Sequence, residues 1–460
     1  MAERTTRRWL DIAVPVALVL GTAASRLPRL SRPDAFVFDE VYYALDAGDI
    51  VRRGVERGGV VHPPVSKWLI AGGIRAFGFT AFGWRAAALV CGCLVVLFTY
   101  LAARQIVAGH LLPALAGGLV ALDGISFTTG RVAMIDVFVA VFVTAAMWFV
   151  LMAFRDPTNT RRVTLCQWGV AVSLGLGIAT KWNAAFVLGA CLVFFLLLHA
   201  RTAAGERQGR ALLKTIVILT VVPAAIYVAT YSVWMLKIDK TWIAIQDCKQ
   251  EQHCSYSIAD RFLLLRDDQV RIYDFQRGLK SDNNSNAALA YEWATQNRPS
   301  TLFRKTCVPE FEAAPSDLSD HSCDGAAAGD ITEIVAVANP VVWFAGLASG
   351  VLLLFWAVFR RNVTAMLLLA FLAVQWGPWL LDPISPWKLQ DRYAYSFYIT
   401  PIIPVLALMT TAVLARPAFK WVRPVIAAAT VAAFVFYWPI WVGKPMSPDQ
   451  IQARHYWEAY

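Results

Sequence analysis

Long apolar segments constrain this chain more than any other feature. About eleven stretches are long and apolar enough for an α-helix to cross the hydrocarbon core of a bilayer, which takes roughly 20 residues. They are residues 10–28, 84–106, 110–127, 132–154, 164–180, 182–200, 212–234, 335–359, 363–381, 394–414 and 424–442. Charged residues make up only 16 % of the chain, against about 25 % in soluble proteins. The sequence therefore predicts an all-α, polytopic membrane protein.

Basic residues between these segments predict how the chain is oriented. Arginines and lysines gather before the first segment and after the fourth, sixth, eighth and tenth segments: Arg4, Arg7, Arg8, Arg155, Arg161, Arg162, Arg201, Arg207, Arg210, Lys214, Arg360, Arg361, Arg416, Lys420 and Arg423. Loops rich in Lys and Arg stay in the cytoplasm. Eleven spans then place the N-terminus inside and the C-terminus outside. A cleaved signal peptide is an alternative for the first segment only.

This topology divides the chain into six regions. Residues 1–28 form a cytoplasmic tail and the first span, and residues 29–83 form an outer loop with interfacial helices. Spans two to seven occupy residues 84–235, and a second outer loop follows at 236–334. The last four spans occupy residues 335–442, before an outer tail at 443–460. The net charge of +10 is explained by the cytoplasmic loops, so no nucleic acid is expected as a partner.

The second outer loop holds four of the eight cysteines, namely Cys248, Cys254, Cys307 and Cys323. An even number of cysteines outside the cytoplasm predicts two disulfides, with three possible pairings. A zinc site that includes His253 and His321 is the alternative, but the spacing matches no standard zinc pattern. We expect no metal and no cofactor.

Polar residues with the chemistry of a transferase follow the first span. Asp39 and Glu40 come directly after an apolar run, so that one carboxylate can act as a general base in a partly desolvated cleft. The alternative is that both are merely solvated charges. His62 precedes two prolines and Lys67, which places Lys67 at the outer interface. Lys67 is either a phosphate ligand or a lysine whose long stem reaches up to water.

Further ionisable residues lie at the outer ends of other spans. They are Asp123 near the outer end of the third span, Arg131 and Asp136 at the start of the fourth, Lys181 and Asn183 after the fifth, and Lys388 and Arg392 between the ninth and tenth. Ionisable groups at membrane depth usually face a cavity or a partner, and a structural Arg131–Asp136 pair is the alternative. If the topology holds, all these residues meet at the outer leaflet. Cations there suit a lipid-linked phosphate, while carboxylates suit a sugar and a hydroxyl acceptor.

In the order and spacing of these motifs, the chain resembles the bacterial protein O-mannosyltransferases of the actinobacterial type, which have the GT-C glycosyltransferase fold. The matching segments are residues 38–43, 62–67, 122–136, 180–183, 339–343 and 391–393. The resemblance implies an inverting transfer of mannose from polyprenyl phosphate mannose to Ser or Thr of a secreted protein, at the outer face of a bacterial plasma membrane. Asp39 matches the family's general base, Glu40 orients the acceptor, and Arg131 matches an important arginine. Arg392, Lys67 and Lys388 are candidates to stabilise the departing phosphate. The secretion translocon is a candidate partner.

Two other functions are compatible with the same motifs. The chain is either a related transferase with a lipid or glycan acceptor, or a transporter of a lipid-linked sugar. Transporters commonly show two related halves, which are not visible in this sequence.

Overall fold

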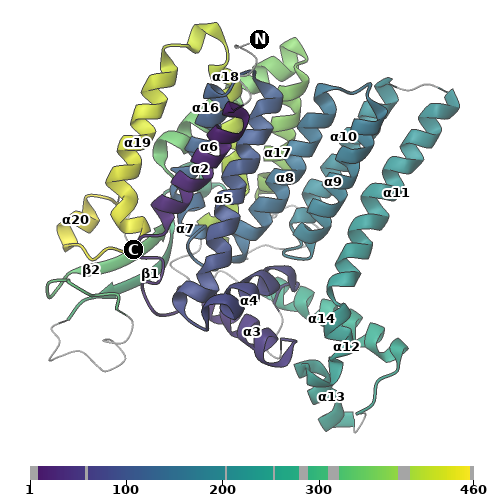
Figure 1. Ribbon diagram of the computed structural model, residues 1–460, viewed down its shortest axis with the longest axis vertical. Coiled ribbons are helices and arrows are strands. Elements are labelled where there is room, and N and C mark those ends of the chain that lie inside the picture. The colour runs from purple at the N-terminus through teal and green to yellow at the C-terminus, as the bar shows by residue number, and fades with distance from the viewer. Residues whose placement is uncertain are drawn as a thin grey trace.

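The structure is a computed structural model that describes residues 9–56, 61–202, 205–251, 254–278, 288–308, 321–381 and 394–455. Most of these residues are helical (Figure 1). Among these described residues, seven helices are long and apolar enough to span a membrane: α5 (Ala81–Ile106), α8 (Ile135–Arg155), α10 (Ala184–Thr202), α11 (Gly205–Thr230), α16 (Pro340–Arg360), α17 (Val363–Leu380) and α19 (Val422–Trp441). The chain thus has the helices of a multi-pass membrane protein.

The other four predicted spans are helices that are shorter or more polar than those seven. They are α2 (Leu10–Arg26), α6 (Leu111–Ala121), α9 (Thr160–Ile178) and α18 (Ile402–Leu414). The run that contains α6 is interrupted where Asp123 accepts a hydrogen bond from Ser126 N and begins the short helix α7 (Gly124–Thr129). By length and composition alone, the structure supports seven spans and leaves the number eleven as a prediction.

Shorter elements fill residues 29–83 and 236–334, the two loops that the sequence predicts on the outer side and that keep the name outer loops below. The first loop contains α3 (Glu40–Arg53) and α4 (Val65–Phe77). The second contains α12 (Ser232–Leu236), η1 (Ile238–Lys240), α13 (Trp242–Glu251), α14 (Ile258–Gly278), η2 (Glu292–Ala294), β1 (Ser300–Thr306) and β2 (Ile331–Ala336). Later in the chain come η4 (Ser396–Ile399), η5 (Pro417–Phe419) and α20 (Pro448–Gln452).

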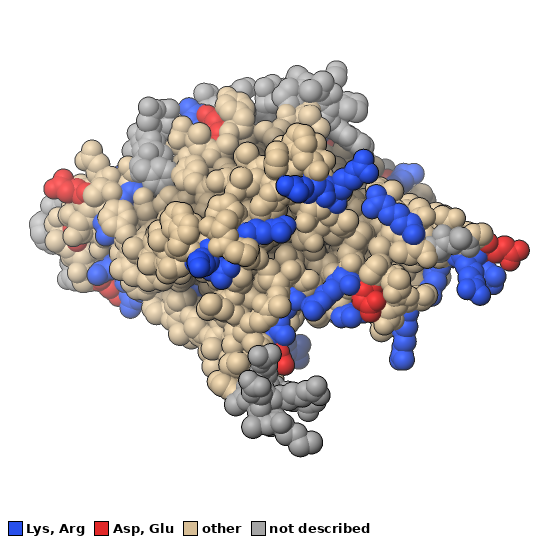
Figure 2. Space-filling view, turned by 90° about the horizontal axis from the view of Figure 1, so that it is seen from above, with Lys and Arg blue, Asp and Glu red and all other residues tan. Residues whose placement is uncertain are grey.

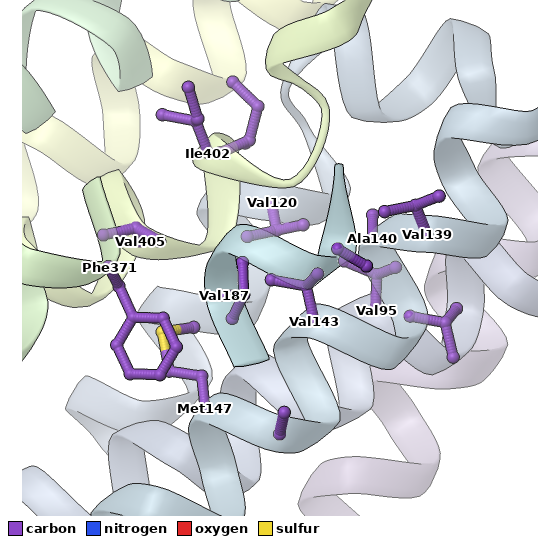
Figure 3. Packing of buried hydrophobic residues seen from close by; sticks show 14 of the residues in the cluster. Val95, Val120, Val139, Ala140, Val143, Met147, Val187, Phe371, Ile402 and Val405 are labelled. Atoms are coloured by element: carbon purple, nitrogen blue, oxygen red, sulfur yellow. The ribbon is translucent and has the colours of Figure 1, made fainter. Parts of the chain in front are cut away.

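The core of the bundle surrounds α8, which packs against α5 and α9. Val139, Val143 and Met147 of α8 lie on one face of the helix and meet Val95 of α5 and Val187 of α10 (Figure 3). Apolar residues spaced three or four apart form such a face on a helix. The start of α8, with Asp136, is buried with the rest of the helix.

The two ends of the bundle differ in charge. The α5–α6, α8–α9, α16–α17 and α18–α19 connections lie at the upper end in Figure 1, together with the end of α10 and the start of α11. Figure 2 shows this end, where Lys and Arg side chains outnumber Asp and Glu. The outer-loop elements α3, α4, α12–α14, β1 and β2 lie at the opposite end. The basic loops thus share one end of the bundle, and the acidic candidate residues face the other.

The second outer loop contains a small sheet, so the expectation of an all-α chain needs a correction. β1 and β2 pair antiparallel, with Arg304 opposite Glu333 and Thr306 opposite Ile331. Ile331 also exchanges backbone hydrogen bonds with Met446 near the C-terminus. The residues 331–336 read Ile-Thr-Glu-Ile-Val-Ala and are rich in β-branched types, which favour strands.

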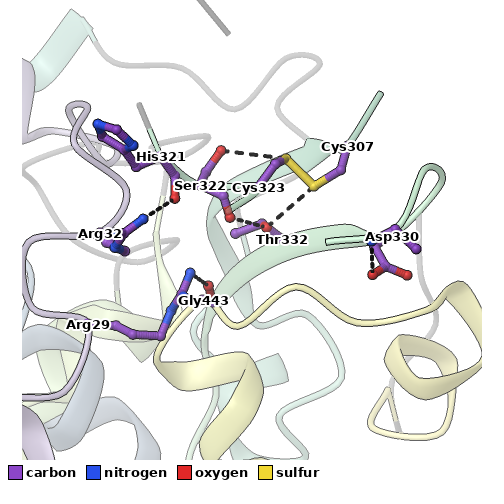
Figure 4. Close-up of a disulfide and its surroundings, with 10 residues drawn as sticks. Arg29, Arg32, Cys307, His321, Ser322, Cys323, Asp330, Thr332 and Gly443 are labelled. Carbon is purple, nitrogen blue, oxygen red and sulfur yellow. Dashed lines mark hydrogen bonds between the residues drawn. A yellow bond between two sulfur atoms is a disulfide. The ribbon is translucent and has the colours of Figure 1, made fainter. Parts of the chain in front are cut away.

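Two disulfides fix this outer region. Cys248 is bonded to Cys254, between α13 and α14, and Cys307 is bonded to Cys323 beside the sheet (Figure 4). Thr332 Oγ1 donates to the carbonyl oxygen of Ser322 at 2.8 Å. Arg32, from the loop before α3, donates to the carbonyl oxygen of His321 at 3.0 Å. The second disulfide therefore holds a segment that contacts the loop leading to Asp39.

Candidate active site

Asp39 immediately precedes α3 and is partly buried. Phe38, just before it, has the left-handed φ of 51°, which turns the chain sharply into the helix. Tyr43 lies one turn along α3, with its hydroxyl 3.5 Å from Asp39 Oδ2. Burial, and then the negative charge of Asp136, raise the pKa of Asp39 to about 6, although Lys181 acts in the opposite direction. A carboxyl with this pKa is suited to accept a proton near neutral pH.

Asp136 and Lys181 form a buried ion pair next to Asp39. Lys181 Nζ lies 2.8 Å from Asp136 Oδ1, and the ammonium sits 3.9 Å from the centre of the Tyr398 ring. Asp136 comes from the first turn of α8 and Lys181 from the turn between α9 and α10. The structure thus brings together three of the residues singled out from the sequence, Asp39, Asp136 and Lys181.

Glu40 faces away from this group and is fully buried. Its two carboxylate oxygens accept from Arg85 Nε and Nη2, each at 2.8 Å, and also from the backbone N–H groups of Val37 and Ala133 at 2.8 Å. Arg85 additionally donates to the carbonyl oxygens of Leu30, Pro33 and Ala35. Glu40 therefore holds the loop that carries Asp39, which differs from the expectation that it orients the acceptor.

Lys67 is also committed to internal partners. Its ammonium lies 2.6 Å from Glu56 Oε2 and 3.0 Å from Asp46 Oδ2, and the residue is 1 % exposed. Burial alone would lower the pKa of Lys67, but the two carboxylates outweigh it and raise that pKa. Burial raises the pKa of Glu56 to about 7, against the opposing effect of Lys67. Lys67 is thus part of a buried ion cluster between α3 and α4, and its role as a phosphate ligand stays a prediction from the sequence.

Arg131 and Asp123 lie outside the Asp39 group. Arg131 donates to the carbonyl oxygens of Arg26 and Pro28 and so holds the end of α2; it forms no pair with Asp136. Asp123 Oδ2 accepts from Asn339 N at 3.0 Å, which joins the start of α7 to the start of α16. Both residues position helix ends around the site.

His62 and Asn183 lie near residues that contact Asp39 and Lys181, namely Tyr43 and Tyr398. The His62 ring lies 6.1 Å from the ring of Tyr43. Asn183 faces a pocket between α8, α10 and α17, with Gln375, Trp379 and Tyr398 among its lining residues. Within the described part of the chain, Asn183 Oδ1 and Gln375 Oε1 are buried and accept no hydrogen bond. Lys388 and Arg392 lie outside the described residues.

Two residues near the site were missed by sequence reasoning. Arg85 lies four residues into a strongly apolar helix, and an arginine in such a place signals a functional or structural partner. Tyr398 lies in η4, inside the segment 394–414 that was predicted as a span, and no pattern there distinguishes it from other aromatic residues. Only the fold brings its ring to Lys181.

Comparison with known proteins agrees with the motifs. The model of the family "dolichyl-phosphate-mannose-protein mannosyltransferase" matches residues 77–237. The chain is 28 % identical to the polyprenol-phosphate-mannose–protein mannosyltransferase of Mycolicibacterium smegmatis, over 95 % of this chain and 90 % of that one. It is 29 % identical to the protein of that name from Mycobacterium tuberculosis, over 96 % and 90 % of the two chains. The resemblance seen in the sequence is confirmed.

Solved structures show the same fold. A chain of the Saccharomyces cerevisiae protein O-mannosyltransferase Pmt1–Pmt2 complex bound to the sugar donor superposes with a TM-score of 0.78 at 13 % identity, over 100 % of this chain and 94 % of that one. ArnT from Cupriavidus metallidurans bound to undecaprenyl phosphate superposes with a TM-score of 0.53 at 14 % identity, over 93 % and 65 %. The chain therefore shares the fold of these proteins.

Proposed function

We propose that this chain transfers mannose from polyprenyl phosphate mannose to Ser and Thr hydroxyls of proteins, with inversion at the anomeric carbon. The observation that carries the proposal is the group formed by Asp39, Asp136 and Lys181, in a chain that aligns over 95 % of its length with a relative named for this reaction. The group combines a carboxylate of raised pKa with a cation, as a displacement at a sugar phosphate requires.

Asp39 is the general base in this proposal. The acceptor hydroxyl gives its proton to the Asp39 carboxylate while the oxygen attacks the anomeric carbon. The bond between that carbon and the phosphate oxygen breaks, and polyprenyl phosphate leaves with the electron pair. No covalent intermediate on the protein is needed, since a single in-line displacement inverts the configuration. Glu40 and Arg85 act as positioning residues, because they hold the Asp39 loop through buried hydrogen bonds.

Lys181 supplies the positive charge for the departing phosphate. The charge of Lys181 acts on Asp39. The Lys181 ammonium lies on the ring of Tyr398, and Tyr398 also lines the pocket between α8, α10 and α17. Val139, Val187 and Val374 give this pocket an apolar wall. Asp136 keeps Lys181 in place. Lys388 and Arg392 remain candidate phosphate ligands on sequence grounds.

The topology completes the proposal. Eleven spans would place the basic loops in the cytoplasm and the Asp39 group at the outer face of the plasma membrane. Secreted proteins would be the acceptors there, and the secretion translocon would be a partner that supplies them unfolded. The upper, basic end of the bundle and the opposite position of α3 support this orientation.

A reconstituted transfer assay tests the substrates. Purified protein in liposomes receives polyprenyl phosphate [¹⁴C]mannose and a Ser/Thr-rich peptide, and the same peptide with every Ser and Thr replaced by Ala is the control. The proposal predicts label on the first peptide only, in an α-mannosidase-sensitive linkage. If glycolipids are added as acceptors and the label appears on them and not on the peptide, the result would favour the lipid-acceptor alternative. Movement of intact donor across the bilayer without transfer would favour the transporter.

A further inference from the structure

The outer edge of β1 carries backbone groups that point away from the sheet. In an antiparallel pair of strands, two opposed residues either exchange backbone hydrogen bonds with each other or both direct their N–H and C=O groups away from the partner strand. Ile331 uses its N–H and C=O for Met446 on the far side of β2, so it does not bond to Thr306 opposite it. Thr306 therefore directs its own N–H and C=O to the outer edge of β1. Arg304, two residues earlier in the same unbroken register, does the same.

This edge is accessible along the second half of the strand. Arg304 and Thr306 are exposed. Across the described ranges of the chain, no backbone group bonds to either residue from the outer side. The opposite edge of the sheet is closed at Ile331 by Met446. The sheet thus offers one edge that can pair with a further extended segment.

The strand β1 also packs against the segment that carries Asp39. Leu302 packs in one apolar cluster with Val37, and Phe303 and Phe38 flank that cluster. Phe38 is the residue directly before Asp39, and its ring lies 5.3 Å from that of Tyr395. A strand rises by about 3.4 Å per residue, so an extended segment laid on Arg304 and Thr306 needs only a few more residues to pass these rings and reach the Asp39 carboxylate.

We propose that the acceptor polypeptide docks on the outer edge of β1 as a third strand, and that the Ser or Thr to be modified follows at Asp39. This inference rests on the proposed function, since that function requires a polypeptide acceptor. Pairing through the backbone is independent of side chains, which suits an enzyme whose acceptors share a hydroxyl more than a sequence. It also requires an unfolded, extended acceptor, because a folded protein has few unpaired strands to offer.

A pair of variants isolates the proposed backbone contact. Arg304→Pro removes the outward N–H without removing a hydrogen bond to β2, and proline is tolerated at such edge positions. Arg304→Ala is the matched control, because both variants lose the contact between Arg304 and Glu333. We expect the KM for a long peptide acceptor to be about three- to tenfold higher for Arg304→Pro than for Arg304→Ala, as for one lost hydrogen bond. With a single blocked threonine as acceptor, which cannot reach β1, the two variants should transfer at the same rate.

Backbone-modified acceptors test the proposal on the unmodified enzyme. A peptide with one Thr is N-methylated at one position at a time on both sides of that Thr. We expect transfer to fall at alternate positions on one side only, as strand pairing requires. Uniform transfer to all these peptides by an active enzyme, or equal KM values for the two variants, would overturn the docking proposal and leave the transferase in place. No transfer to the unmodified peptide would instead contradict the proposed function. If the protein dimerises through the outer edge of β1, the KM for the peptide should rise with protein concentration. That result would also overturn the proposal.

Discussion

Two Lys-Trp dipeptides lie at the end of the bundle that carries α3 and α4, and they show how differently the fold uses the same residues. Lys67, before Trp68, is held by two carboxylates at 2.6 and 3.0 Å. Lys181, before Trp182, pairs with Asp136, lies on the ring of Tyr398 and acts electrostatically on Asp39. The first lysine ties α3 to α4, whereas the second stands beside the proposed base. Lys67 and Lys181 are alike in burial and charge, so the residues around each lysine determine its role.

Replacing Lys181 should have the largest effect on catalysis. Lys181→Ala removes the cation that we assign to the departing phosphate, and we expect transfer to fall by about a hundredfold or more, as when one such group is removed from other active sites. Lys181→Arg keeps the charge and should recover part of the rate. Initial rates at several donor concentrations check this. A Lys181→Ala enzyme with nearly full activity would remove the distinction between the two lysines.

Replacing Lys67 should instead reduce stability. Lys67→Met leaves Glu56 and Asp46 buried with no cation, which costs about 3–5 kcal/mol when one partner of a buried pair is lost. Thermal unfolding in detergent should shift to a lower temperature. The double variant Lys67→Met/Glu56→Gln should regain part of the loss, because one uncompensated charge is gone. A stable Lys67→Met protein that loses transfer as severely as Lys181→Ala would show that Lys67 takes part in the reaction.

The pH dependence of transfer should report Asp39. Its pKa is raised to about 6, and a general base works only when ionised, so activity should be full above this value and lost as the pH falls through it. We expect kcat/KM to decline about tenfold per pH unit below pH 6. A rate profile between pH 4.5 and 8 tests this, with unfolding monitored at each pH. An activity that stays constant down to pH 4.5 would contradict the assignment.

A smaller effect separates the two charged clusters. The negative charge of Asp136 raises the pKa of Asp39, so Asp136→Asn should move the acidic limb of the pH profile to lower pH, whatever happens to the absolute rate. Glu56→Gln changes a carboxylate of the other cluster and should leave the limb where it is. An equal shift in both variants would mean that the limb belongs to some other group.

The helices were the part of the fold that could be predicted from sequence. Long apolar segments and the basic residues between them indicate where helices lie and which ends they share. Their number is harder to predict, because α6 and α18 are 11 and 13 residues long and end at Ala121 and Leu414. The strand β1 alternates between buried and more exposed residues, whereas β2 is buried throughout, and both lie in a loop that is polar as a whole. The polar composition of residues 236–334 as a whole hid the short β-branched stretch at 331–336.

The site was predicted in outline and not in its pairings. The convergence of Asp39, Asp136 and Lys181 follows from counting spans, since all three then fall at one face. Which cation meets which carboxylate depends on tertiary distances. Arg131 is five residues from Asp136 and still reaches back to α2, whereas Lys181 arrives from another helix connection. Glu40 could not be distinguished from Asp39 by sequence, because its partner Arg85 is 45 residues away.

The most direct test of the central claim is the rate of transfer by Asp39→Asn. Asp49→Asn is the matched control, since Asp49 lies on α3, which Asp39 directly precedes, and it contacts only Arg52 and Arg53 among the described charged residues. Both proteins are reconstituted at equal amounts with labelled polyprenyl phosphate mannose and a Ser/Thr peptide. The account predicts that Asp39→Asn binds donor but transfers no detectable label, while Asp49→Asn transfers as the unmodified protein does. Transfer by Asp39→Asn at the rate of its control would contradict the assignment of Asp39 as the base.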